Sequence, residues 1–429
     1  MQRFLMEELV KWKDRKDHKP LLLSGARQVG KTWLMKEFGA NYFKKTVYIN
    51  FDKDGRLHDL LERTIDPKSI LSAIAALYDI KPDPMDTLII FDEVQEEPRA
   101  LASLKYFCEE APEYAVISAG SFMGIALRKG TTFPVGKVDS MTLYPLSFRE
   151  FIKACEKEAL CDLLESRDIS LICSMKDEFV RLLKDYYIVG GMPEVVSDYI
   201  EHGDLYSCRE KQENLIGFYR QDFMKHASGA TIQRLSQVWD SLPSQLAKEN
   251  KKFIYGVVKK GGRAKEFETA IQWLSDCGLI HKVYRISKPG IPLKGYVEIS
   301  DFKIYMHDVG LLGAMSELPI ESVVNGDRLF SEFKGAMTEQ YVLQQMVSEW
   351  GITPLYYSAE NSRGEIDFVI QKMDEVLPVE VKSAENLRAK SLKAFVEKFG
   401  LSRGVRISMS DYREQDWLTN YPLYAFMVL

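Results

Sequence analysis

The sequence lacks three features that would define its class. It has 6 cysteines in 429 residues, scattered and without a CxxC pair, which excludes a disulfide scaffold and the ligand spacing of a zinc finger. Its apolar runs fall well short of the roughly 20 residues that cross a bilayer. The first residues contain no apolar core of the kind found in signal peptides. We therefore expect a reduced, cytoplasmic protein without a membrane segment.

Positive charge is not in excess either. Lys and Arg number 57 against 62 for Asp and Glu, a net charge of −5, so any nucleic-acid site must be a local basic patch. Hydrophobic residues make up 46% of the chain, which is enough for packed cores and excludes disorder. At roughly 150 residues per domain, the length suggests about three domains.

Residues 1–150 alternate β-rich and helical segments. Short apolar or β-rich runs occupy residues 19–25, 46–50, 87–93 and 114–121, and helical patterns fill the gaps between them. This alternation predicts an α/β fold with a parallel sheet and helices on both faces.

The pattern changes after this region. Residues 151–228 read as successive helices broken at Gly190-Gly191 and Pro193, which predicts a helical subdomain. Residues 229–300 show helices followed by a short β pattern, an order that resembles a winged helix. Residues 301–429 begin a second α/β region, with a long helix and then several strands.

A phosphate-loop motif, GxxxxGK[ST], lies between the first predicted strand and the helix that follows it. In such a loop the backbone N–H groups face the phosphates, the lysine reaches the β and γ phosphates, and the hydroxyl of the last residue ligates Mg²⁺. The alternative is an ordinary glycine-containing turn. The predicted ATP-binding residues are Gly25, Ala26, Arg27, Gln28, Val29, Gly30, Lys31 and Thr32.

Two acids end the predicted strand LIIFDE, which matches the Walker B pattern. Asp92 would hold Mg²⁺, and Glu93 would act as the general base toward the attacking water. The alternative is a strand that simply ends in exposed acids. No guanine-reading NKxD motif occurs, so we expect ATP rather than GTP.

The strand after Walker B ends in SAGS. Ser121 could sense the γ-phosphate, or it could be a plain helix N-cap. Arg128, in the loop that follows, could act in trans on the nucleotide of a neighbouring copy. The alternative is a solvated loop arginine.

Taken together, these motifs resemble a prokaryotic AAA+-like ATPase family with an uncharacterised C-terminal domain. GARQVGKT, LIIFDEVQ, SAGS, YPLSFREF and GGMPEVV occur in the order seen in that family, and KIYMHDVGLLGAM and PVEVKSAEN resemble its C-terminal part. The resemblance implies an ATP-binding, Mg²⁺-dependent ATPase with a winged helix and a nuclease-like fold. Family members carry Gly-Arg where this chain has Gly136-Lys137, so the family's arginine is missing there.

The C-terminal region contains the D…ExK pattern of PD-(D/E)xK nucleases. Asp367 precedes Glu380 and Lys382, which are two residues apart on one predicted strand and so point to one face. Asp367, Glu380 and Glu339, the last on the preceding helix, would bind Mg²⁺, and Lys382 would orient or deprotonate a water. The alternatives are an inert, degenerate nuclease fold or a charged strand edge.

Residues 248–265 form a basic segment with a charge of +6 and interleaved aromatics. A basic loop leading into a helix of a winged-helix unit is typical of contact with DNA phosphates. The alternative is a solvated lysine face. The predicted DNA contacts are Lys251, Lys252, Lys259, Lys260, Arg263 and Lys265.

The sequence thus predicts four domains: a P-loop ATPase core (1–150), a helical subdomain (151–228), a winged helix (229–300) and a restriction-endonuclease-like α/β domain (301–429). Our first hypothesis is an ATPase that couples Mg²⁺-dependent hydrolysis to a DNA-bound winged helix and a nuclease-like domain. The second is an ATP-regulated switch or scaffold whose nuclease-like domain is inert. Expected partners are ATP and DNA, with a homo-oligomer left open.

Overall fold

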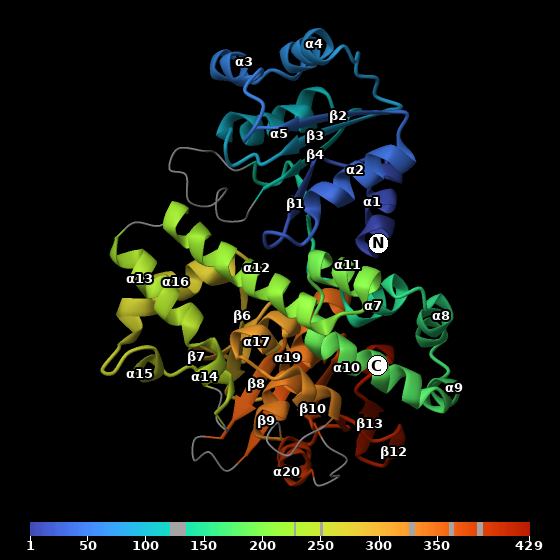
Figure 1. Cartoon of the computed structure of the whole chain (residues 1–429), viewed down its shortest axis with the longest axis vertical. Coiled ribbons are helices and arrows are strands. Elements are labelled where there is room, and N and C mark those ends of the chain that lie inside the picture. Colours follow the sequence, from blue (N-terminus) through green and yellow to red (C-terminus); the bar gives the residue numbers. More distant parts are fainter. Residues whose placement is uncertain (121–133, 227–228, 249–251, 326–330, 360–363, 384–388) are drawn as a thin grey trace. The chain divides into compact units, whose positions relative to one another are not determined.

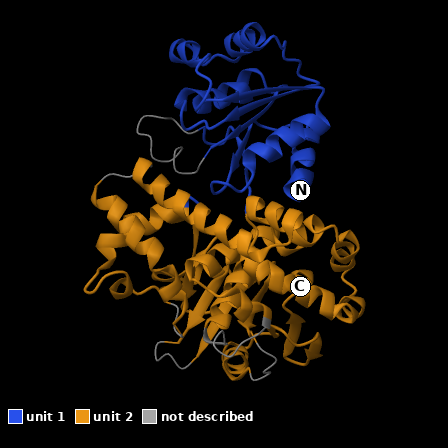
Figure 2. Ribbon diagram, viewed as in Figure 1, with its two compact units in different colours: residues 1–144, 276–278 blue, residues 145–275, 279–429 orange. Residues whose placement is uncertain are grey.

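A computed structural model describes residues 1–120, 134–226, 229–248, 252–325, 331–359, 364–383 and 389–429. The chain divides into two compact units (Figure 2): residues 1–144 with 276–278, and residues 145–275 with 279–429. The predicted boundaries at residues 228 and 300 both fall inside the second unit. Across the described ranges, no helix has the length and apolar content that crossing a membrane requires.

The first unit is the predicted α/β fold (Figure 1). Its five strands lie in the order β2-β3-β4-β1-β5, and every neighbouring pair is parallel, which confirms the parallel sheet. Its elements are α1 (Leu5–Asp14), β1 (Leu21–Ser24), α2 (Lys31–Tyr42), β2 (Lys45–Asn50), α3 (His58–Arg63), α4 (Pro67–Tyr78), β3 (Thr87–Asp92), α5 (Pro98–Glu110), β4 (Ala115–Ala119) and β5 (Asp139–Thr142).

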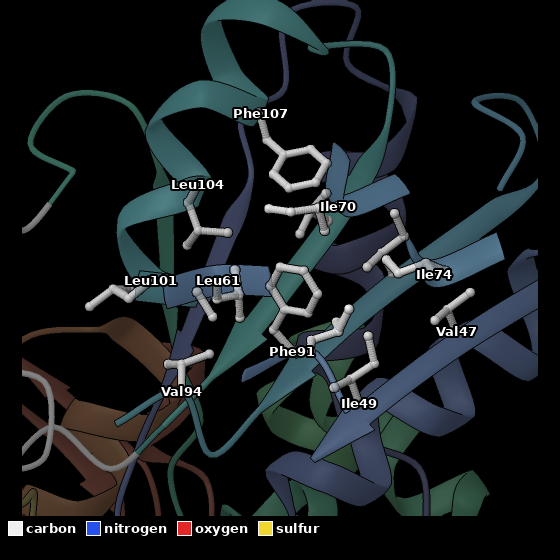
Figure 3. Close-up of a cluster of buried hydrophobic side chains, with 14 of the residues drawn as sticks. Val47, Ile49, Leu61, Ile70, Ile74, Phe91, Val94, Leu101, Leu104 and Phe107 are labelled. Atoms are coloured by element: carbon white, nitrogen blue, oxygen red, sulfur yellow. The ribbon is translucent and has the colours of Figure 1, made fainter. Parts of the chain in front are cut away.

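A cluster of buried hydrophobic side chains packs one face of this sheet against α3, α4 and α5 (Figure 3). Ile49 and Phe91 from the strands point toward Ile70, Leu104 and Phe107 of the helices. Each such side chain stabilises the fold by about 1.5–3 kcal/mol when it is fully buried. Because the strands are covered by helices, β1, β3 and β4 are buried at every position, which explains their mostly apolar sequences.

The second unit begins with the predicted run of helices. Ser147 and Glu150 form a capping box that starts α7, so the SFRE part of the YPLSFREF motif is a helix start signal. Gly190 ends α10 with a φ of 71°, and Pro193 is the first residue of α11. The helices are α7 (Phe148–Ala154), α8 (Glu158–Ser166), α9 (Ile169–Ser174), α10 (Lys176–Val189), α11 (Pro193–His202), α12 (Leu205–His226), α13 (Ala230–Asp240), α14 (Leu242–Leu246), α15 (Tyr255–Val258) and α16 (Ala264–Asp276).

An eight-stranded sheet completes this unit, in the order β12-β13-β11-β10-β9-β8-β6-β7. The hairpin of β6 (Ile280–Ile286) and β7 (Val297–Met306) joins the C-terminal strands through parallel pairing of β6 with β8, so the predicted boundary at residue 300 lies inside β7. The remaining elements are α17 (Val309–Met315), α18 (Ile320–Asn325), α19 (Ser331–Trp350), β8 (Leu355–Ser358), β9 (Glu365–Lys372), β10 (Glu375–Val381), α20 (Lys390–Phe399), β11 (Gly404–Ser408), β12 (Arg413–Gln415) and β13 (Leu418–Pro422).

A buried carboxylate joins the sequence motifs of the second unit. Asp308, with no exposed surface, accepts hydrogen bonds from the backbone N–H groups of Gly191 (2.6 Å) and Leu311 (3.0 Å) and from the Gln344 amide (3.1 Å). The Gln344 amide also donates to the Tyr186 hydroxyl, 2.9 Å away. The GGMPEVV and KIYMHDVGLLGAM segments therefore have a structural role, since they supply both sides of one buried polar network.

Candidate functional site

The predicted phosphate loop occupies residues 25–30, between the end of β1 and the start of α2. Gly25 has a φ of 148°, and a Cβ added there would lie 2.3 Å from the Leu143 carbonyl oxygen. Gly30 has a φ of 92° immediately before the helix begins. Both positions therefore require glycine. The strand–loop–helix context that the motif needs is present.

An arginine near the N-terminus supports this loop, and sequence reasoning missed it. Arg3 is buried; its guanidinium donates to the Val29 carbonyl (3.0 Å) and to the Tyr144 carbonyl (2.6 Å). These bonds tie the loop to the segment that follows β5. No local motif marks such a residue, because its partners are 26 and 141 positions away.

Lys31 lies folded against its own loop. Its ammonium donates to the carbonyl oxygens of Gly25 and Ala26, both 2.9 Å away. Burial lowers the pKa of Lys31 to about 8, although the negative charges of Glu93 and Asp92 oppose this shift. A phosphate anion at the loop would give this ammonium a better partner than the two carbonyls.

The Mg²⁺ ligands predicted from the two motifs lie side by side. The Thr32 hydroxyl donates to Asp92 Oδ2 across 2.7 Å, and Asp92 is almost completely buried. Hard oxygen ligands of this kind are the ones that Mg²⁺ takes alongside nucleotide phosphates. The residues present therefore fit the ion that the motifs imply.

Tyr48 is a further member of this site that the sequence did not reveal. Its hydroxyl donates to Asp92 Oδ2 (2.8 Å) and accepts from the Asn50 amide (3.2 Å). Burial raises the pKa of Tyr48 to about 12, so the hydroxyl stays a donor at neutral pH. The parallel register of β2 and β3 pairs Asn50 with Asp92 and so brings these groups together.

Glu93, the predicted general base, has an unusual backbone. Its φ is 54°, in the left-handed region, and its carboxylate accepts a short hydrogen bond from the Gln95 side-chain amide. Gln95 is buried. β4 lies between β1 and β3 in the sheet. Ser121 and Arg128, which follow β4 in the sequence, lie outside the described residues.

The predicted C-terminal residues come from three elements of the second unit. Asp367 lies on β9, Glu380 on β10 with Lys382 just after it, and Glu339 on α19. Lys382 Nζ is 2.8 Å from Glu380 Oε1, as expected for residues on one face of a strand. Burial lowers the pKa of Lys382, but the hydrogen bond and charge of Glu380, with the charges of Asp367 and Glu339, raise it overall.

Two of these carboxylates accept hydrogen bonds from the chain. Asp367 Oδ2 accepts from the Val381 N–H (2.7 Å), and Glu339 Oε2 accepts from the Tyr305 hydroxyl (3.0 Å). Within the described ranges, no group of three or more His, Cys, Asp or Glu side chains is arranged to hold a metal ion. The metal-binding role of Asp367, Glu380 and Glu339 therefore stays a prediction. Glu380 Oε1 is paired with the Lys382 ammonium, whereas the buried Glu380 Oε2 has no hydrogen-bond partner among the described residues.

The basic segment lies on α15, α16 and the loops beside them. Lys252 is paired with Asp301 (2.6 Å) and Lys259 with Glu266 (3.3 Å). Exposed cationic side chains follow in the turn and at the start of α16. These are Lys260, Arg263 and Lys265. Lys251 lies outside the described residues.

Three protein-family models match separate parts of the chain. Residues 17–152 match the model described as an AAA domain. Residues 180–322 and 334–426 match two models described as domains of unknown function, DUF8612 and DUF4143. Among proteins with curated descriptions, none matches this sequence.

Solved structures with similar coordinates include a Walker-type ATPase of Pyrococcus abyssi, PABY2304, with 15% identity and a TM-score of 0.45 over 72% of this chain and 95% of that one. The Aeropyrum pernix Orc1 protein in complex with DNA has 10% identity and a TM-score of 0.29 over 75% and 92% of the two chains. AMPPCP-bound DnaA from Aquifex aeolicus has 11% identity and a TM-score of 0.29 over 63% and 85%. The match of residues 17–152 to the AAA-domain model, together with the phosphate-loop geometry, supports ATPase activity for this part of the chain.

Proposed function

We propose that this chain is a Mg²⁺-dependent ATPase whose second unit contacts DNA. The observation that carries the proposal is the 2.7 Å hydrogen bond between the Thr32 hydroxyl and the Asp92 carboxylate, directly beside the glycine-rich loop. Two motifs 60 residues apart in the sequence supply this pair, and it has the chemistry of a nucleotide-bound magnesium site.

Each residue of the first unit has a distinct role in this proposal. The N–H groups of residues 25–32 bind the phosphates at the start of α2, and Lys31 leaves the loop carbonyls to bind the terminal phosphates. Mg²⁺, when bound by Thr32 and Asp92, would neutralise charge on the phosphates. Glu93 takes a proton from the attacking water after its carboxylate leaves Gln95.

The basic segment supports DNA as the partner of the second unit. The order α15, turn, α16, then the β6–β7 hairpin is that of a winged helix, in which the second helix enters the major groove. Lys260 in the turn and Arg263 and Lys265 at the start of α16 are exposed and could each neutralise a phosphate. Lys252 and Lys259 contribute less, because each is already paired with an acid.

A steady-state ATPase assay with and without duplex DNA tests the proposal. We expect Asp92→Asn to reduce turnover by about 100-fold or more, because a neutral amide holds Mg²⁺ less strongly than a carboxylate and the ion is needed to neutralise charge on the phosphates. Lys44→Ala, which changes an exposed lysine of the same unit, serves as the matched control and should leave turnover unchanged. Equal turnover in wild type and Asp92→Asn would refute the ATPase proposal.

DNA binding is tested separately by the salt dependence of a fluorescence-anisotropy titration. Lys260→Glu combined with Lys265→Glu should weaken binding and reduce the slope of log affinity against log salt by about 2, since roughly one counterion is released per phosphate contact. Lys393→Glu, an exposed lysine on α20, is the control. An unchanged slope would rule out this segment as the DNA contact.

A further inference from the structure

Tyr48 lies on the face of β2 that is turned toward α2. Val47 and Ile49 belong to the hydrophobic cluster on the opposite face of the sheet, so the side chain between them points the other way. The Lys36 ammonium of α2 lies 3.9 Å from the centre of the Tyr48 ring. The ring is therefore covered by the same helix whose first turn carries Thr32.

The hydrogen bonds around the Tyr48 hydroxyl give its proton one direction. Asn50 Oδ1 accepts from the Asp52 N–H across 3.0 Å, so the amide nitrogen of Asn50 faces Tyr48 and donates to its hydroxyl oxygen across 3.2 Å. The single proton of that hydroxyl then goes to Asp92 Oδ2, 2.8 Å away. Tyr48 is therefore an oriented donor to the Asp92 carboxylate.

Hydrogen bonds hold the Asp92 carboxylate at both oxygens. Oδ1 accepts from the Glu93 N–H (3.0 Å), and Oδ2 accepts from the hydroxyls of Thr32 (2.7 Å) and Tyr48 (2.8 Å). Asp92 is almost completely buried, so these donors take the place that water has at an exposed carboxylate. The carboxylate is thus fixed by donors from α2, from β2 and from the end of β3.

We propose that Tyr48 is a positioning residue for Mg²⁺, because its hydroxyl holds the Asp92 carboxylate in the orientation in which Asp92 and Thr32 bind the ion. The inference rests on the proposed function and extends its metal site to β2, with Asn50 as the residue that orients the tyrosine. Outer partners of this kind contribute about 10–100-fold to metal affinity, although they do not touch the metal.

Binding of the fluorescent, non-hydrolysed nucleotide mant-AMPPNP to the full chain tests this role without turnover. The ratio of its affinity in excess Mg²⁺ to its affinity in EDTA measures what the ion contributes. Tyr48→Phe should lower this ratio by about tenfold or more and leave the affinity in EDTA unchanged. Asn50→Ala, which keeps the hydroxyl but no longer orients its proton, should lower the ratio by a smaller factor. Tyr42→Phe, at an exposed position at the end of α2, is the control.

The results separate this inference from the function on which it rests. If Mg²⁺ does not raise the affinity of wild type, the proposed Mg²⁺-dependent function fails, and the role of Tyr48 fails with it. If Mg²⁺ raises the affinity of wild type and Tyr48→Phe has the same ratio, only the positioning role is refuted. A loss of affinity in Mg²⁺ and EDTA alike gives that same ratio and indicates a role in the fold alone.

Two further results bear on the same role. A larger ratio in Tyr48→Phe also refutes it, since the hydroxyl would then compete with the ion for the Asp92 oxygen. If Tyr48→Phe does not fold, the Asn50→Ala ratio decides. A lowered ratio supports the positioning role, and an unchanged ratio refutes it.

Discussion

ATP binding should take up a proton at alkaline pH, because of the position of Lys31. Its ammonium donates to two loop carbonyls, and burial lowers its pKa to about 8. Phosphate contacts favour the charged form and should return the pKa to 10.5 or above. At pH 9 about nine-tenths of the free protein would carry neutral Lys31, so each binding event should take up about 0.9 proton.

The same pKa difference fixes how affinity and stability change with pH. The affinity for MgATP should fall about tenfold for each pH unit between 8 and 10, as the proton must be supplied on binding. The free protein should change in the opposite direction. Because Lys31 of the unfolded chain keeps its proton up to pH 10.5, the Lys31 contribution to the free energy of unfolding should rise with pH from about 8 to 10.5. Its full extent is about 3 kcal/mol.

Calorimetric titration with ATP in two buffers of different ionisation enthalpy measures the proton uptake directly. The terminal phosphate itself is fully ionised above pH 8 and does not contribute. Lys31→Met should abolish the uptake at pH 9, and Lys44→Met should retain it. If wild type shows no uptake at pH 9, or if Lys31→Met shows the same uptake as wild type, then Lys31 is not the group whose charge ATP restores.

Two further substitutions test how the sites are built. Gly25→Ala should destabilise the first unit by about 2 kcal/mol or more and weaken ATP binding, since its Cβ would meet the Leu143 carbonyl at 2.3 Å. Gly55→Ala, where a Cβ meets nothing within 4 Å, is the control, and equal urea midpoints for the two variants would contradict the clash. Asp308→Asn should cost about 1–3 kcal/mol, because an amide group would face backbone donors. Asp416→Asn, at an exposed position, is the control and should leave the free energy of unfolding unchanged. Equal losses of stability for the two variants in urea unfolding would show that the buried network contributes nothing.

The nucleotide site was predictable because its signals are local. The phosphate loop is a continuous motif, and its glycines are needed because the backbone there has positive φ angles. Asp92 comes directly after four consecutive apolar residues of one strand. The order of the strands was not predictable, because no local sequence signal indicates that β4 lies between β1 and β3 in the sheet. Arg3 and Tyr48 were missed for the same reason, since each acts on a residue distant in sequence.

The C-terminal carboxylates show what a sequence pattern leaves out. The D…ExK spacing placed Glu380 and Lys382 on one face, where their side chains are 2.8 Å apart, but it gave no indication of Lys303, whose ammonium pairs with Glu365. A signal for that residue does exist in the sequence. Lys303 lies in the run FKIYM, whose neighbours are all apolar and buried, so a lysine there must have a buried acid as partner. Its partner, Glu365, is 62 residues away and could not be identified without the fold.

The network around Asp308 determines how the second half of the protein can be divided experimentally. One of the two family models that match there ends at residue 322 and the other begins at residue 334, so the two pieces could be expressed as separate fragments. Gly191 and Asp308 lie on one side of that gap, but Gln344 lies on the other. Cutting the chain at this gap would expose a buried carboxylate and leave its amide donor on another fragment. The bounds of the two family models are therefore a poor guide to which pieces of the second unit can fold by themselves.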